Sequence, residues 1–155
     1  MAFAGMFMVF LFFVLAILFV NYVLEAIGLS MIFNKTFANK KWKAWIPIYN
    51  QYTLFKNLNI IWNFILNIII PIACNYLYSI TEYSFFLTAS SLYLIAMNVR
   101  ITYLLFNIIY GRDEDKTKLV LFCIAAIFAY PIVLIILGVK AKPVYNSRTS
   151  GSVYK

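Results

Sequence analysis

Four long apolar runs dominate the pattern of hydrophobic and polar positions along this chain. Residues 1–24 contain one clearly polar side chain, that of Asn21. As a helix rising about 1.5 Å per residue, this run exceeds a hydrocarbon core of about 30 Å. None of the runs shows the in-out alternation of barrel strands. The pattern predicts an all-α, polytopic integral membrane protein with about four transmembrane helices, at about 3–24, 58–78, 85–109 and 119–139.

The segment between the first two runs, residues 34–56, mixes lysines with aromatic side chains. Aromatic rings settle at the headgroup level of a bilayer, and lysines there meet anionic lipid phosphates. We expect a short amphipathic interfacial helix that ends near Trp45, followed by a turn around Pro47. The residues expected at the interface and against lipid are Lys40, Lys41, Trp42, Lys43, Trp45 and Tyr49.

Composition agrees with a membrane protein, since 65% of the residues are hydrophobic and only 12% are charged. Soluble domains have about half apolar and about a quarter charged residues. No Lys or Arg precedes the first run, so we expect it to remain as a span and not to be removed as a signal peptide. The expected organisation is a single transmembrane domain over residues 1–139 and a polar, flexible tail over 140–155.

The distribution of positive charge predicts an orientation. Lys and Arg number five between the first two spans, none between the second and third, three in the loop after Gly111 and four in the tail. With both termini outside a bacterial cytoplasmic membrane, eight of them face the cytoplasm and four face out, so the positive-inside rule favours that arrangement. The four positive charges of the tail would then face out, which the positive-inside rule does not favour. A cytoplasmic tail would mean that the fourth run is re-entrant or that another run lies in the interface.

The chemistry that the chain can support is narrow. It has no histidine, which removes the usual metal ligand and the usual general base at neutral pH. Its glycines form no phosphate-binding loop. We therefore predict no catalytic residue, no cofactor and no metal site. The net charge of +8 does not predict nucleic acid as a partner, because the basic residues flank hydrophobic segments and set topology there.

The second run carries asparagines at four-residue spacing, which places them along one ridge of a helix. Such a ridge should avoid lipid: it either forms hydrogen bonds between helices or lines a polar path for a solute. Proline within a run frees a backbone carbonyl and can kink the helix, so we expect kinks at Pro71 and Pro131. The ridge consists of Asn59, Asn63, Asn67 and Asn75.

Two charged residues fall within or beside the predicted spans. Arg100 lies about 16 Å along the helix from the loop at Gly111, at a depth where an unpaired charge is costly. Glu25, at the inner end of the first span, is the expected partner in an intramembrane ion pair. Two alternatives remain for Arg100, namely snorkelling to the interface and binding an anionic substrate or lipid headgroup.

The block WKAWIPIYN at Trp42–Asn50, followed by YTLFKN, resembles the signature of a bacterial family of small multi-spanning membrane proteins of unknown function. PIACN at Pro71–Asn75, YGR at Tyr110–Arg112 and IFAYPIVLIILG in the last run are similar to later elements of that family. The stretch between Asn75 and Tyr110 is longer here. Some members are attached to type I signal peptidases, but the loop between the second and third spans has no lysine for a Ser-Lys dyad. The resemblance implies an accessory membrane module with no catalytic residues to transfer.

These observations favour a non-enzymatic integral membrane subunit, or an accessory or scaffold factor, of a larger bacterial envelope complex for secretion, conjugation or transport. Its expected partners are membrane lipids and either other membrane subunits or further copies of itself. The alternative is a small oligomeric transporter or channel with a polar path lined by the asparagine ridge of the second span.

Overall fold

The computed structural model describes residues 2–37, 39–111 and 115–143, with side chains from Gly5 onward. Four of its helices are long and apolar enough to cross a membrane, which confirms the predicted helical membrane class. Two shorter helices lie between the first and second of these. In chain order the helices are α1 (Ala2–Lys35), the 3-10 helix η1 (Lys41–Trp45), α2 (Tyr49–Asn57), α3 (Ile61–Thr81), α4 (Phe85–Tyr110) and α5 (Lys116–Lys140).

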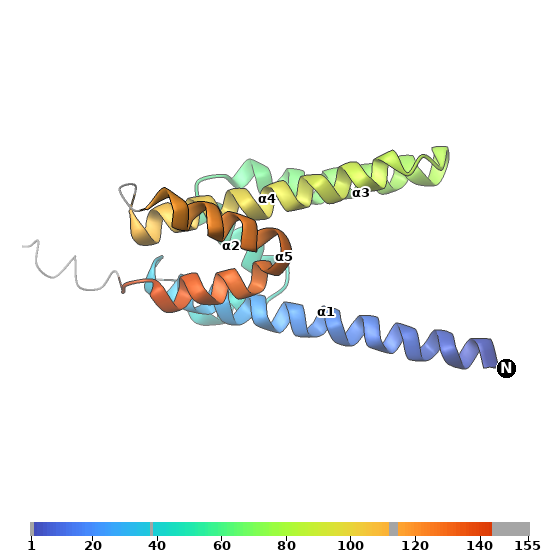
Figure 1. The fold of residues 1–155 in the computed structure, drawn as a ribbon, viewed down its shortest axis with the longest axis horizontal. Coiled ribbons are helices and arrows are strands. Elements are labelled where there is room, and N and C mark those ends of the chain that lie inside the picture. The colour runs from blue at the N-terminus through green and yellow to red at the C-terminus, as the bar shows by residue number, and fades with distance from the viewer. Residues whose placement is uncertain (1, 38, 112–114, 144–155) are drawn as a thin grey trace, which may run out of the picture.

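The helices pack together in one half of the molecule and diverge in the other (Figure 1). The N-terminal part of α1 leaves the packed half as one arm, and the hairpin of α3 and α4 leaves it as a second. We call these the α1 arm, residues 5–21, and the α3–α4 arm, the ends of the two helices that meet at the turn Glu82–Ser84. The largest buried side chains all come from the packed half: Leu29, Ile32, Phe33, Leu54, Phe55, Ile101, Leu105, Phe106, Val133, Leu134 and Leu137.

The segment from η1 to α2 runs back along α1 and then returns. At its tip, the Tyr22 hydroxyl donates a hydrogen bond to the backbone oxygen of Trp45 (2.5 Å), well before the end of α1 at Lys35. At its base, the Asn39 side chain donates to Asn57 Oδ1 (3.2 Å). The predicted short helix ending at Trp45 is confirmed, whereas α2 was not predicted and turns the expected loop into a helical hairpin.

Helix α5 is broken in its middle. Ala129 has non-helical backbone angles (φ −143°, ψ 49°) two residues before Pro131, whose ring cannot fit against the carbonyl one turn earlier. The predicted kink at Pro131 is confirmed. At Pro71, by contrast, α3 continues as one helix. Figure 1 shows that the two halves of α5 fold back on each other, so that both ends of α5 lie at the same end of the molecule.

The two halves of α5 pack on different neighbours. The first half lies against α4, where the ring of Phe122 is 5.5 Å from that of Phe106. The second half packs very closely against α1 at two glycines, Gly28 of α1 and Gly138 of α5. A Cβ added to Gly28 would come within 2.7 Å of Leu134 Cβ, and one added to Gly138 within 2.8 Å of Met31 Cβ. The absence of side chains at these glycines therefore allows α1 and α5 to touch.

Both ends of α5 are capped by side chains. At its start, the Asp115 carboxylate accepts a hydrogen bond from the backbone N–H of Thr117 (2.9 Å), as an N-cap residue does. This bond lowers the pKa of Asp115 below its ordinary value. At its end, Lys35 Nζ donates to the backbone oxygens of Gly138 and Val139, both at 3.0 Å. A cation at this position also complements the helix dipole.

Candidate functional site

The tip of the η1–α2 hairpin and the break in α5 both reach α1 at the same level. Polar side chains gather there, inside a half of the molecule that is otherwise apolar. We call this place the Glu25 junction. It consists of Tyr22 and Glu25 from α1, Trp45 and Gln51 from the η1–α2 hairpin, and Tyr130 from α5.

The carboxylate of Glu25 is the only acidic group that the described helices α1 to α4 carry. It is partly buried and accepts a hydrogen bond from Gln51 Nε2 (2.5 Å). A neutral amide therefore contacts this carboxylate. Because an ionisable group at membrane depth is costly and usually has a functional reason, Glu25 is the leading candidate for a functional side chain.

Tyr130 directly follows the broken residue Ala129 and directly precedes Pro131. Its side chain is only 9% exposed, and within the described part of the chain its hydroxyl has no hydrogen-bond partner. The hydroxyl lies within electrostatic range of Glu25. Buried tyrosine hydroxyls usually find a partner, so the junction contains a polar group whose bonding capacity is unused by its neighbours.

Asn50 holds the hairpin tip in shape. Its side chain is 3% exposed. Its amide donates to the backbone oxygen of Ala44 (3.4 Å), and its Oδ1 accepts from the backbone N–H of Gln51 (2.5 Å). The tip itself is strained, because the β-branched Ile48 has a φ of 65°, a region such residues rarely adopt. The WKAWIPIYN block therefore builds the turn that presents Gln51 to Glu25.

The predicted ion pair between Glu25 and Arg100 is wrong for the described residues. Glu25 instead bonds to Gln51, and Arg100 is exposed on α4. The physical reason is the position of α5, whose two halves pack separately against α1 and α4 and so lie between them. The exposed side chain of Arg100 is free to extend toward the membrane interface, as snorkelling requires.

The asparagine ridge does not form one polar lining. Asn59 precedes α3 and has a φ of 57°. Asn63 faces α4 and donates to Met97 Sδ (3.7 Å). The Asn67 Oδ1 is buried without a partner in the described chain. Asn75 is exposed and donates to the backbone oxygen of Pro71 in its own helix (2.8 Å). The four therefore differ in their surroundings: Asn63 contacts α4, the Asn67 oxygen is buried, Asn59 precedes the helix and Asn75 is exposed.

The residues expected at the interface cluster as an aromatic and cationic surface on the η1–α2 hairpin. The rings of Trp42 and Tyr49 stack with their centroids 6.0 Å apart, and Lys43 Nζ lies 5.9 Å from the Tyr49 centroid. Lys40, Lys41 and Trp45 are also exposed. Such surfaces suit the headgroup region of a bilayer.

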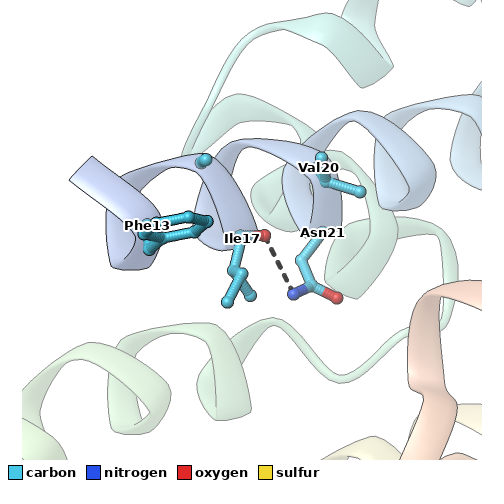
Figure 2. Close-up of a pocket in the computed structure, with 5 residues that line it drawn as sticks. Phe13, Ile17, Val20 and Asn21 are labelled. Atoms are coloured by element: carbon cyan, nitrogen blue, oxygen red, sulfur yellow. Dashed lines mark hydrogen bonds between the residues drawn. The ribbon is translucent and has the colours of Figure 1, made fainter. Parts of the chain in front are cut away.

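A shallow apolar hollow of about 230 Å³ lies on the α1 arm. Figure 2 shows Phe13, Ile17, Val20 and Asn21 along it; the Asn21 amide donates to the backbone oxygen of Ile17 (3.0 Å). The volume is below the about 300 Å³ at which ligand pockets begin. Its single polar side chain, Asn21, donates one hydrogen bond within its own helix, and the other lining residues are apolar.

Sequence reasoning missed Gln51, Asn50, Tyr22 and Tyr130 as partners of one site. The available signal was the repeated association of proline with tyrosine, in IPIYN and in AYPIV, which marks both interruptions. The sequence does not indicate that the turn at IPIYN and the break at AYPIV both lie beside Glu25, because their positions depend on how the helices pack.

The fold defines a multi-pass helical membrane protein with two interrupted segments. No family model, curated protein or solved structure matches this chain. The resemblance carried by the WKAWIPIYN block therefore stays an expectation, and function has to be argued from the residues themselves.

Proposed function

We propose that this protein is a non-enzymatic integral membrane subunit, or scaffold factor, of a larger bacterial envelope complex. The observation that supports this most directly is the pair of arms. On the α1 arm the side chains of Met6, Phe10 and Phe12 are 65–71% exposed, and α3 has no buried residue. The packed half anchors the chain, while the arms offer long helical surfaces to neighbouring membrane helices.

Polar side chains on the arms favour protein neighbours over lipid alone. Asn21, Asn75 and Ser91 are exposed, and each donates only to a backbone oxygen of its own helix. Lipid tails cannot satisfy the remaining amide and hydroxyl groups. A neighbouring helix can, and each such bond stabilises association by about 1 kcal/mol or less. The arms therefore carry weak but specific points of attachment.

Purification from the native membrane in nanodiscs, with mass spectrometry of the co-purifying chains and of the intact particle, tests this proposal. We expect foreign subunits in fixed stoichiometry. The double variant Asn21→Leu, Asn75→Leu should lower their recovery, whereas the matched apolar change Ile72→Leu should not. A particle with no foreign subunit would contradict the proposal.

A small oligomeric transporter or channel is the second candidate, favoured by the Glu25 junction. In transporters, interrupted helices bring polar groups together inside the membrane. The relevant side chains here are Glu25, Gln51 and Tyr130, and the asparagine ridge contributes less. Proton or K⁺ flux into proteoliposomes that is lost in Glu25→Gln and kept in Gly5→Ala would support transport. No flux by the unaltered protein would reject it.

A further inference from the structure

The two halves of α5 are each too short to cross a bilayer. As one straight helix its 25 residues would span about 37 Å, which is enough. The break at Ala129 divides it into segments 116–128 and 130–140, of about 20 Å and about 16 Å at 1.5 Å per residue. A hydrocarbon core is about 30 Å thick. Neither half reaches from one face to the other.

The packing partners show that the halves run in opposite directions. Phe122, near the start of α5, lies beside Tyr110 at the end of α4 (ring centroids 6.3 Å apart). The C-terminal residues Gly138 and Val139 lie at the end of α1, where Lys35 binds their carbonyls. In Figure 1 the C-terminal ends of α1 and α4 are at the same end of the molecule. The chain therefore enters and leaves α5 at that one end.

We infer that α5 is a re-entrant helical hairpin and that the chain crosses the membrane three times, through α1, α3 and α4. Three crossings place Lys142 on the opposite side of the membrane from Ala2 and Glu82, whereas four crossings would place all three on the same side. Ala2 therefore lies on the side of Glu82, and Lys142 lies on the side of Gly111 and Asp115. This inference is independent of the function proposed above.

The positive charges support this topology. Of the 13 Lys and Arg residues, Arg100 lies within α4. Every other one lies between α1 and α3, between α4 and α5 or after α5, or in the last turn of α1 or the end turns of α5. With three crossings all of these share one face, whereas four crossings would place the tail's four opposite the rest. The positive-inside rule assigns the shared face to the cytoplasm.

The non-helical backbone at the tip of α5 is compatible with a re-entrant hairpin. Non-helical backbone at membrane depth is tolerated where it is buried in protein. Tyr130, beside the break, is 9% exposed, and Ala126, one turn before it, is 2% exposed. One side of the tip is thus packed inside the protein, whereas Phe128 (85% exposed) and Ile132 (51% exposed) on either side of the break present apolar side chains outward, where lipid can accommodate them.

Site-directed cysteine labelling of the full chain tests the inference. In a background with Cys74→Ala and Cys123→Ala, single changes Lys116→Cys, Lys142→Cys and Glu82→Cys would be treated with a membrane-impermeant maleimide in intact cells and in inverted vesicles. We expect Lys116→Cys and Lys142→Cys to react only in inverted vesicles and Glu82→Cys only in intact cells. Reaction of Lys142→Cys together with Glu82→Cys would overturn the inference.

A second measurement covers the case in which a cysteine variant fails to insert. Green fluorescent protein fused after Lys155 fluoresces only on the cytoplasmic side, and alkaline phosphatase at the same position is active only outside. We expect a fluorescent and phosphatase-inactive pair of fusions. The opposite pair would place the fusion point outside and overturn the inference.

Discussion

Replacing Gly28 by alanine tests the closest helix contact in the molecule. The new Cβ would lie 2.7 Å from Leu134 Cβ and 2.8 Å from the backbone nitrogen of Ile135. Real Cβ contacts are longer, and backbone atoms cannot move aside as the end of a flexible side chain can. The helices must therefore separate along the contact that holds the second half of α5 against α1.

The magnitude follows from two opposing terms. Overpacking of this kind costs about 1–3 kcal/mol. Alanine in a helix interior recovers about 0.5–1 kcal/mol relative to glycine. We expect Gly28→Ala to lower the free energy of unfolding by about 1–2 kcal/mol. Gly5 is the matched control, because a Cβ there meets nothing within 4 Å, so Gly5→Ala should leave stability unchanged or raise it.

Unfolding in mixed detergent micelles, followed by far-ultraviolet circular dichroism as the denaturing detergent increases, measures both variants. The difference between Gly28→Ala and Gly5→Ala is the informative quantity, since it cancels the helix-propensity term. Equal stability of the two variants would refute the close packing of α1 on α5. Gly138→Ala, with Met31 Cβ at 2.8 Å, should repeat the result for Gly28.

Three further predictions concern the caps and the hairpin tip. Lys35→Met removes both hydrogen bonds to the end of α5 and should cost about 1–2 kcal/mol in the same unfolding assay; a loss no larger than that of Lys41→Met would contradict the capping role. Ile48→Gly relieves a backbone with φ of 65° and should raise stability by up to about 1 kcal/mol, so a decrease would show that the tip is unstrained. Because the folded-state pKa of Asp115 is lowered, its contribution is present above the unfolded pKa and is lost as pH falls through the folded pKa. The protection of the Thr117 amide, measured as its exchange rate relative to the intrinsic rate at the same pH, should fall across that acidic window. Asp115→Asn, which also caps but does not titrate there, should make this protection independent of pH.

The helix positions were predictable because they depend on local composition. Each predicted span overlaps one of the long helices closely, since twenty or so consecutive apolar residues have few alternatives to a helix. The limits differ where tertiary contacts extend a helix. α1 continues to Lys35, past the polar Glu25, because Leu29, Ile32 and Phe33 bury themselves against other helices.

The neighbours of each helix were not predictable in the same way. The four-residue spacing of asparagines predicted a ridge that avoids lipid. Asn63 contacts Met97 of α4 and the Asn67 Oδ1 is buried, but spacing cannot show that Asn59 falls in a turn. Likewise, Pro131 predicts a kink without its angle. The close approach at Gly28 and Gly138 accompanies the fold-back of α5, and two glycines so far apart in the chain give no pairing signal.

The Glu25 and Arg100 prediction failed for a related reason. Opposite charges at similar depth attract, but a pair forms only if no other element separates the helices. Gln51, from a helix that the sequence did not reveal, occupies the place beside the carboxylate. A missed secondary structure element thus removed the expected partner of Glu25.

The bond from Lys35 to Gly138 joins residues 103 positions apart, which bears on how the protein is made. Chains are synthesised from the N-terminus at about 5–20 residues per second, so α1 is complete long before its neighbour α5 exists. Until then, the face of α1 around Gly28 has no helix against it. Helix α5 is made after α1 to α4, so a chain that stops before Leu134 lacks both the close contact at Gly28 and the cap that Lys35 provides.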